Sequence, residues 1–304
     1  MRKILLTLCL SILLYSCGVV TPEPEVSENL QLETQILEEK INKLNRLREQ
    51  ARLLKQENKC ENINDINLNI LVYNNFELDG VIDENIINTE NILNLESFEE
   101  NIKLLKKYND EQKIYIAGLN ELEFFEEEGC FPNKNLVLLI SNNSKVSFYT
   151  EIFPIIEKYN IKYNLALNTA NLRKTGRYEN FMTTPELLEI INTNNFDFLS
   201  NGVTGIRLTN IENKEKLKHE ICSSKNYLDT NFIHNTSAIF YPEGKYNDEI
   251  IDLTRECEYK YGIYINNNQN NKTEQKNGLI GNNKYKLRGY NMDKNFDFNK
   301  ILNN

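Results

Sequence analysis

Residues 138–167, LLISNNSKVSFYTEIFPIIEKYNIKYNLAL, contain the pattern that decides the fold. An apolar run typical of a buried strand leads through a polar loop into an amphipathic helix over 147–159, and a second apolar run follows at 162–167. A strand, a helix and another strand in this order are typical of α/β proteins with parallel strands. The polar loop consists of Ser141, Asn142, Asn143 and Ser144. Loops at the carboxyl ends of such strands usually carry the chemistry, yet this one has no carboxylate.

The same alternation recurs along the chain. Seven apolar runs have the composition of strands: 68–73, 113–119, 135–140, 162–167, 196–200, 237–242 and 260–265. Amphipathic segments predict helices near 95–108, 119–128, 147–159, 183–194, 213–230 and 247–257. Repeated β/α alternation predicts parallel strands wrapped by helices, in an open sheet or a barrel, with the functional site at the carboxyl ends of the strands.

The N-terminus resembles a bacterial lipoprotein signal. Arg2 and Lys3 precede the apolar run 4–14, which is shorter than a membrane span, and the segment ends at Cys17. We expect residues 1–16 to be removed and Cys17 to be acylated, which would anchor an exported protein to a membrane of the bacterial cell envelope. An ordinary signal peptide with an incidental cysteine is the alternative.

Charge and cysteine content restrict the partners. The formal net charge is −9, and it falls to about −11 once Arg2 and Lys3 are removed. We therefore expect no nucleic-acid partner. Beyond the leader the cysteines are Cys60, Cys130, Cys222 and Cys257. They contain no C-x-x-C pair, so no metal knuckle is predicted, and their spacings do not identify any disulfide, although export would permit one.

Two segments separate the leader from the main domain. Residues 17–26 contain two prolines and predict an extended tether, while 27–60 predict a helix with an apolar stripe. The stripe repeats every seven residues at Leu30, Leu37, Leu44 and Ala51. A stalk or short coiled coil and a helix packed on its own domain explain it equally well. The main domain is expected to cover 64–304.

From residue 68 onward, several segments resemble motifs of one family in the right order. Residues 130–144, CFPNKNLVLLISNNS, stand where the family has a strand ending in TFDDG, and 197–205, DFLSNGVTG, where it has an H-x-x-x-H pair. Further matches are 70–74, 97–109, 154–167, 237–263 and 284–292. The chain thus resembles the polysaccharide deacetylases, the family-four carbohydrate esterases with a NodB-homology domain. The match is to the exported branch acting on poly-N-acetylglucosamine. This implies a distorted (β/α) barrel, here preceded by an N-terminal helix.

The resemblance also indicates where the chemistry of the family should lie. Active members use one aspartate as general base and hold a divalent metal such as zinc with another aspartate and two histidines. Here Asn142 takes the position of the base, and Asn143, Asn201 and Gly205 take those of the metal ligands. An amide is a weak, neutral ligand and cannot accept a proton near neutral pH, and glycine offers no ligand. We therefore expect no metal cofactor and a catalytically degenerate site.

Other matched positions suggest a cleft wall. They are Tyr73, Asn74, Tyr241, Pro242 and Arg288. A tyrosine at the end of a buried strand is more often a core residue than a sugar platform, and a structural ion pair is the commoner role for such an arginine. The two histidines, His219 and His234, match no ligand position, and we expect both to face solvent.

We therefore interpret the chain as an envelope lipoprotein whose degenerate deacetylase domain binds a polysaccharide or an envelope protein. The main alternative is an active N-deacetylase that hydrolyses acetamido groups of N-acetylglucosamine polymers through a non-standard site. An accessory subunit beside an intact deacetylase is a third possibility.

Overall fold

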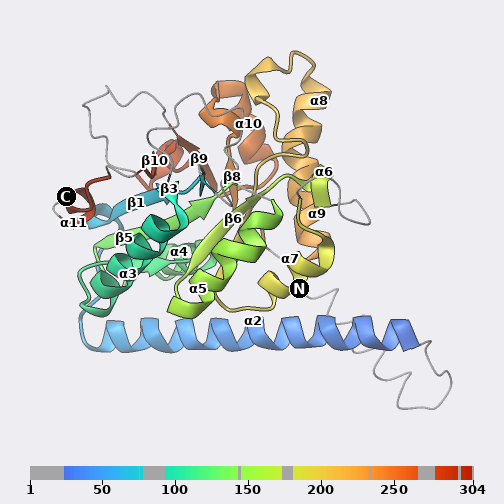
Figure 1. The fold of residues 1–304 in the computed structure, drawn as a ribbon. Coiled ribbons are helices and arrows are strands. Elements are labelled where there is room, and N and C mark those ends of the chain that lie inside the picture. Colours follow the sequence, from blue (N-terminus) through green and yellow to red (C-terminus); the bar gives the residue numbers. More distant parts are fainter. Residues whose placement is uncertain are drawn as a thin grey trace. The chain divides into compact units, whose positions relative to one another are not determined.

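A computed structural model describes residues 24–74, 76–77, 93–142, 145–172, 181–232, 235–265, 278–293 and 296–302. The chain divides into two compact units, residues 1–43 and 44–304, and the second contains the strands (Figure 1). The predicted lipidation site Cys17, the matched ligand position Asn143 and His234 lie outside the described residues. Within the described part, no helix has both the length and the apolar character needed to cross a membrane.

Eight parallel strands form one sheet. They are β1 (Asn67–Val72), β4 (Tyr115–Ala117), β5 (Asn135–Ser141), β6 (Tyr163–Leu167), β7 (Phe196–Ser200), β8 (Ala238–Phe240), β9 (Tyr261–Ile265) and β10 (Leu287–Asn291). The order is β1-β10-β9-β8-β7-β6-β5-β4, and β1 also pairs with β5 from Asn67↔Asn135 to Val72↔Ile140. That pairing closes a ring, so the predicted distorted (β/α) barrel is confirmed.

The distortion arises where β4 enters the barrel wall. One edge of β5 is shared, because its first half pairs with β4 at Leu136–Leu138 and its end pairs with β6 at Ile140 and Ser141. The buried Asn164 of β6 links this strand to β5 and to the first residue of α4 (Leu119–Glu128), since its amide nitrogen donates to Leu139 O at 2.9 Å and its amide oxygen accepts from Leu119 N–H at 2.9 Å. The short strand β4 therefore wedges β5 and β6 apart at their amino ends.

Helices cover the outside of the strands (Figure 1). They are α3 (Leu95–Asp110), α4 (Leu119–Glu128), α5 (Phe153–Tyr159), α6 (Thr169–Leu172), α7 (Thr184–Ile191), α8 (Lys214–Lys218), α9 (Ser224–Asn231), α10 (Asp248–Glu256) and α11 (Asn299–Leu302). Two π-helical turns, η3 (Phe148–Ile152) and η5 (His219–Ser223), precede α5 and α9 directly. Short 3₁₀ turns are η1 (Ile63–Asp65), η4 (Leu208–Asn210), η6 (Pro242–Gly244) and η7 (Gly281–Tyr285). Strands β2 (Phe76–Glu77) and β3 (Leu93–Asn94) form a separate small sheet.

Side chains alternate between the two faces of each strand, as strand geometry requires. One set fills the barrel and includes Ile70, Val72, Leu138, Ile140, Ala166, Leu199, Phe240, Ile263 and Leu287. The other set packs outward on helices and includes Leu71, Val137, Leu139, Leu165 and Phe198. This alternation tells which residues at the strand ends face the mouth of the barrel.

The N-terminal helix is confirmed, with a different start. Helix α2 (Pro24–Gln56) begins inside the segment predicted to be extended, with proline in its first turn, where the missing N–H costs nothing. Leu47 and Ala51 are 7% and 2% exposed and belong to the cluster that fills the barrel. For residues 44–56, the structure therefore supports the packed-helix alternative.

Two disulfide bonds cross-link the second unit. The spacing of the cysteines in the sequence did not identify either of them. Cys60 pairs with Cys130 across 70 residues, and Cys222 pairs with Cys257 across 35 residues. Each bond joins segments that only the fold brings together: the segment after α2 to the turn after α4, and η5 to the residue that follows α10. Closing loops of this length restricts the unfolded chain and so stabilises the fold.

Candidate functional site

The matched positions lie at the carboxyl ends of strands. Asn142 follows β5 directly, Asn201 follows β7, and Asn74 stands two residues beyond β1. All the ring strands are parallel, so these positions lie at one end of the barrel, the end that carries the active site in closed α/β barrels.

Asparagine recurs at this end beyond the matched positions. Asn74, Asn142, Asn168 and Asn201 each come two residues after a member of the barrel interior, namely Val72, Ile140, Ala166 and Leu199. Asn291 in β10 pairs in register with Val72. By strand alternation, all five continue the inward-facing rows. We call Asn74, Asn142, Asn168, Asn201 and Asn291 the amide layer.

Two pairs within the amide layer are in contact. The Asn142 N–H donates to Asn74 Oδ1 at 3.3 Å, and the Asn201 Nδ2 donates to Asn168 Oδ1 at 2.7 Å. The backbone ladder continues beneath both pairs, because Tyr73 N–H donates to Ile140 O at 2.8 Å and Asn201 N–H donates to Leu167 O at 2.9 Å. The layer is therefore attached to the strands and is not carried by a detached loop.

Asn168 occupies the space beside the second matched histidine position. Gly205 has φ +75°, and a Cβ built on it would lie 2.5 Å from Asn168 Nδ2. Any side chain at position 205 would therefore meet both a left-handed backbone and the Asn168 amide. Sequence matching missed Asn168, although it directly follows the second strand of the stretch 138–167 and so stands at a strand end.

Two amide oxygens of the layer lack partners. Among the described residues, neither Asn201 Oδ1 nor Asn291 Oδ1 accepts a hydrogen bond, and both atoms are buried. Asn201 as a whole is 5% exposed. Buried polar atoms are nearly always paired, so these two acceptors mark a place where a hydrogen-bond donor is missing.

The loop after β7 is held in place by η5 and α9. The Glu220 carboxylate accepts Thr204 N–H at 2.9 Å and Thr204 Oγ1–H at 3.0 Å. Ser224 Oγ donates to Gly202 O at 3.1 Å, and Gly202 N–H donates to Ser200 Oγ at 3.0 Å. These bonds fix residues 200–204, and with them Asn201, relative to the helices outside the barrel.

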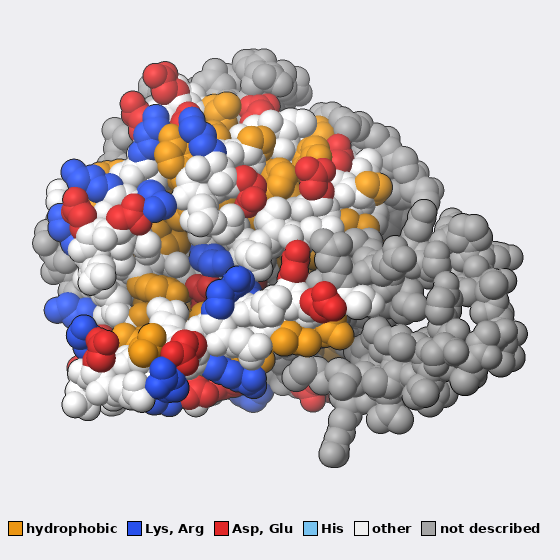
Figure 2. Space-filling view, turned by 90° about the horizontal axis from the view of Figure 1, so that it is seen from below, with side chains coloured by type: hydrophobic (Ala, Val, Ile, Leu, Met, Phe, Trp, Pro, Cys, Tyr) orange, Lys and Arg blue, Asp and Glu red, His pale blue; other side chains and the backbone are white. Residues whose placement is uncertain are grey.

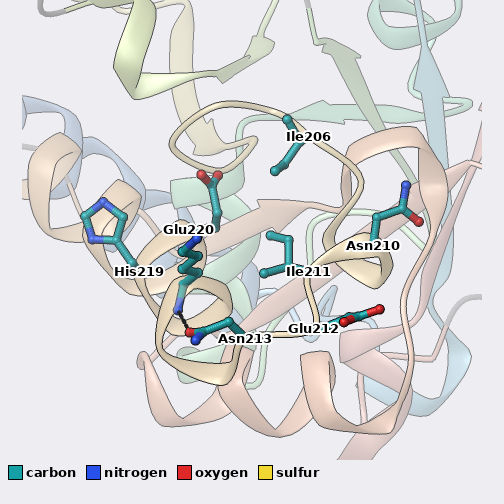
Figure 3. A pocket seen from close by; sticks show the side chains of 8 residues that line it. Ile206, Asn210, Ile211, Glu212, Asn213, His219 and Glu220 are labelled. Atoms are coloured by element: carbon teal, nitrogen blue, oxygen red, sulfur yellow. Dashed lines mark hydrogen bonds between the residues drawn. The ribbon is translucent and has the colours of Figure 1, made fainter.

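A pocket of about 560 Å³ opens beside this loop. Its lining consists of Ile206, Asn210, Ile211, Glu212, Asn213, Lys216, His219 and Glu220. Figure 3 shows the Glu220 carboxylate pointing toward the loop that carries Ile206. His219 is exposed, as expected, and its Nδ1 lies 2.9 Å from Ser223 Oγ. This volume would accommodate a small ligand of one or two sugar rings.

The structure places most of the predicted cleft wall elsewhere. Tyr73 and Tyr241 are 1% and 0% exposed, so both rings lie in the core and not on a cleft. The Tyr73 ring packs edge-on against Phe98, with centroids 5.1 Å apart. Tyr241 OH donates to Tyr285 O at 3.1 Å, and burial raises the pKa of the Tyr241 hydroxyl.

Of the three other positions predicted for the cleft wall, Asn74 contacts another matched position. Pro242 is buried at the start of η6. Arg288 alternates with the inward-facing Leu287, and its guanidinium carbon lies 5.9 Å from the centroid of the Tyr290 ring, so it faces away from the barrel mouth. Asn74 does contact another matched position, Asn142.

The described positions do not fit a zinc-type metal. Among the residues that the structure describes, no group of three or more His, Cys, Asp or Glu side chains is arranged to hold a metal ion. The amide layer offers neutral oxygens, which are weak ligands for zinc. At position 205 the space for an imidazole is taken by Asn168. No chemical step is therefore assigned to a metal here.

Comparison with known proteins finds a family model that matches part of the chain. Residues 130–262 match the family model for polysaccharide deacetylase. This range includes the amide-layer residues Asn142, Asn168 and Asn201. This part of the chain is thus similar to the polysaccharide deacetylases. The poly-β-1,6-N-acetyl-D-glucosamine N-deacetylase of Staphylococcus epidermidis is 25% identical to it over 179 residues, covering 56% of this chain and 60% of that protein. The corresponding Staphylococcus aureus enzyme is 24% identical over 177 residues, covering 55% and 59%. The chain thus spans about 60% of the length of these relatives.

Several solved structures share the fold of this chain. The deacetylase PplD of Streptococcus pyogenes, solved in complex with acetate, superposes with a TM-score of 0.65 at 23% identity, covering 78% of this chain and 97% of that one. A de-N-acetylase from Aggregatibacter actinomycetemcomitans gives 0.60 at 13% identity, covering 77% and 98%. At these identities the likeness concerns the fold, so the function depends on the residues of the site.

Proposed function

We propose that this protein is a non-catalytic, glycan-binding lipoprotein of the bacterial cell envelope, built on a polysaccharide deacetylase domain. The main support is the set of residues at the barrel mouth. The strands end where those of the family end, but asparagine stands at 142 and 201 and glycine at 205, and Asn168 fills the space beside Gly205.

These replacements remove the chemistry of deacetylation. Asn142 cannot act as a general base, and loss of a general base alone typically lowers a rate by ~10²–10⁴. His219, whose Nδ1 lies 2.9 Å from Ser223 Oγ, is exposed on η5 and occupies none of the matched ligand positions. Acetamide hydrolysis would therefore lack both its base and its metal.

The mouth retains groups suited to sugars. Amides donate and accept hydrogen bonds, and five of them are arranged in one layer around the strand ends. The relatives named above are deacetylases of poly-β-1,6-N-acetyl-D-glucosamine, so a hexosamine polymer is the proposed ligand class.

A protein partner is the second candidate. Ile206 is 51% exposed at the edge of the pocket, immediately after the loop that holds Gly205. An exposed apolar side chain beside a pocket suits contact with another protein, including an intact deacetylase. The face drawn in Figure 2 mixes Lys and Arg with Asp and Glu over its coloured part, without the continuous basic surface that would attract nucleic acid.

Export and anchoring are supported by two features. The leader ends at Cys17, and the disulfides Cys60–Cys130 and Cys222–Cys257 belong to an oxidising compartment. We propose that Cys17 carries the lipid and that the domain acts outside the cytoplasm.

The test uses the mature chain, residues 17–304, expressed with its disulfides. We expect retention on immobilised poly-N-acetylglucosamine and no release of acetate with or without added zinc or cobalt. Asn74→Ala should weaken retention about fivefold to tenfold by removing one ligand hydrogen bond. Asn133→Ala, at the opposite end of the barrel before β5, is the matched control and should retain full binding. Metal-dependent acetate release by the unmodified chain would establish the active-enzyme alternative, and absence of any glycan retention would refute the binding proposal.

A further inference from the structure

The helical turn η5 holds the loop that follows β7 from outside the barrel. Val203 N–H donates to Glu220 O at 3.2 Å, and Thr204 N–H donates to the Glu220 carboxylate at 2.9 Å. Thr204 Oγ1 donates to the same carboxylate at 3.0 Å. Figure 3 shows the Glu220 side chain pointing from its helix toward this loop. One residue of η5 therefore fixes two successive residues of the loop, through both its main chain and its side chain.

The same loop is bonded to the loop after β6 at the barrel mouth. Ala170 N–H donates to Val203 O at 2.8 Å, and Asn201 Nδ2 donates to Asn168 Oδ1 at 2.7 Å. The two amide-layer residues that follow β6 and β7 thus belong to a hydrogen-bonded network that ends at η5. Displacement of η5 would disturb this part of the mouth.

η5 has limited support of its own. It is a π-helical turn between α8 and α9, and such turns are rare and usually confined to a single turn. Its Ile221 belongs to a small buried cluster with Leu217 and Tyr259, separate from the clusters that fill the barrel and cover its strands. Tyr259 OH donates to Ile221 O at 2.9 Å. Segments that rest on few buried apolar contacts open more readily than the main core, so the position of Glu220 depends on further support.

The Cys222–Cys257 disulfide supplies that support. Cys222 lies in η5 two residues after Glu220, and Cys257 directly follows α10. The bond therefore ties η5 covalently to a helix that packs in the same small cluster. The other disulfide, Cys60–Cys130, joins segments that precede β1 and β5, so it lies toward the amino ends of the strands, opposite the mouth.

We propose that the Cys222–Cys257 bond is a redox-dependent clamp that completes the barrel mouth after export. The timing rests on the proposed export, whereas the clamp itself does not depend on the ligand. Thiols stay reduced in the cytoplasm and form disulfides in oxidising compartments. Before oxidation the small cluster alone holds η5. Once the bond has formed, Glu220 is fixed and with it Val203 and Thr204.

Bond formation is an exchange with an oxidising protein disulfide. The thiolate of one cysteine attacks that disulfide and forms a mixed disulfide, and the thiolate of the second cysteine then displaces the partner. One S–S bond forms between Cys222 and Cys257, and the partner's S–S bond is reduced to two thiols, which take up the two protons. Two electrons pass from the cysteine pair to the partner.

The experiment compares two double variants of the mature chain, each lacking one disulfide. All proteins carry Cys17→Ser, so that no unacylated Cys17 thiol takes part. Cys222→Ser/Cys257→Ser removes the clamp, and Cys60→Ser/Cys130→Ser is the matched control. Both bonds restrict the unfolded chain to a similar degree, because the entropy of loop closure grows slowly with loop length. A difference between the variants at the mouth therefore reports the clamp.

Amide hydrogen exchange of Val203 and Thr204, whose N–H groups are bonded to Glu220, is the direct measurement. We expect both amides to exchange at least about tenfold faster in Cys222→Ser/Cys257→Ser than in the control, because the loop opens locally. Circular dichroism checks that both variants are folded. Equal exchange rates at the two amides would overturn the proposal.

A second measurement does not require the clamp variant to fold. In Cys60→Ser/Cys130→Ser the remaining bond is reduced with dithiothreitol and formed again with glutathione disulfide, and mass spectrometry after alkylation follows its state. Exchange at Thr204 should accelerate on reduction and slow again on reoxidation. Rates that do not change with the state of the bond would show that η5 is held without it, which overturns the clamp.

Retention on immobilised poly-N-acetylglucosamine separates the clamp from the proposed function. If the oxidised protein binds, retention should fall on reduction, and unchanged retention would overturn the role of the clamp at the mouth. If the oxidised protein retains no polymer, the glycan-binding function fails, whereas the exchange rates still decide the clamp.

Discussion

The glycine at the second matched histidine position provides a quantitative test of the site geometry. Gly205 has φ +75°, and a Cβ there would lie 2.5 Å from Asn168 Nδ2 and 2.8 Å from its Cγ. For Gly205→Ala, the left-handed backbone costs about 1–2 kcal/mol. Displacing Asn168 also breaks its 2.7 Å bond to Asn201, and leaving that buried amide unpaired costs a further ~1–3 kcal/mol. We expect the free energy of unfolding to fall by about 2–5 kcal/mol.

Gly129 offers a matched control. It has φ +61° at the end of α4, but a Cβ there meets nothing within 4 Å. Gly129→Ala should therefore show the backbone cost alone, about 1–2 kcal/mol. Urea unfolding of the oxidised mature chain at pH 7 measures both variants against the parent.

A double-mutant cycle isolates the steric part. In an Asn168→Ala background the obstacle at position 205 is gone, so Gly205→Ala should cost no more than Gly129→Ala. The reasoning is refuted if Gly205→Ala costs the same in both backgrounds, or if it costs less than Gly129→Ala in the parent. Either result would mean that the Asn168 amide does not hold the space beside Gly205.

The same contact decides whether a metal site can be rebuilt. The changes Asn142→Asp, Asn143→Asp, Asn201→His and Gly205→His supply the family's ligand types, but the new imidazole at 205 meets Asn168. We expect this quadruple variant to bind zinc weakly and to gain affinity by about tenfold or more when Asn168→Gly is added, because ligand orientation typically matters by ~10–100-fold. Zinc titration by calorimetry measures this, and tight binding without the Asn168 change would contradict the expectation.

Three other expectations concern the anchor, the metal and the response to pH. Cys17→Ser should release the full-length protein from membranes into the soluble fraction, because stable retention needs acyl chains; equal retention of the variant would refute acylation at Cys17. Micromolar zinc, cobalt or nickel should leave the melting temperature of the mature chain unchanged, and a rise of several degrees would show a metal site. Hydrogen bonds from Lys158 and Tyr159 lower the pKa of Glu99 to about 2. Its stabilising effect is therefore present above the unfolded pKa near 4.5 and is lost as pH falls toward 2, so the stability difference between parent and Glu99→Gln should shrink over that range. A difference that stays constant from pH 6 to pH 2.5 would contradict this assignment.

The sequence by itself determined the local pattern of the fold. Buried strands read as apolar runs and helices as amphipathic segments, so the stretch 138–167 predicts its strand, loop, helix and strand correctly, and repetition of that unit predicts parallel strands. The positions Asn142 and Asn201 could likewise be placed at strand ends, because the end of an apolar run is a local signal. The resemblance to a known family then predicted the closed barrel and the roles that those positions have in active members.

The tertiary structure alone decided which of these side chains meet. Closure of the ring depends on the pairing of β1 with β5, a contact between segments that no local pattern specifies. The sequence left open whether Tyr73 and Tyr241 line a cleft, and the structure places both in the core. Their burial depends on helices that are distant in the sequence and pack against the strand ends. The role of Asn168 beside Gly205 and the contact of Glu220 with Thr204 arise from packing between segments that are separated in the sequence. The local sequence determines whether a segment forms a strand or a helix and which of its side chains share a face. The distances between side chains of different elements are fixed only when the barrel closes.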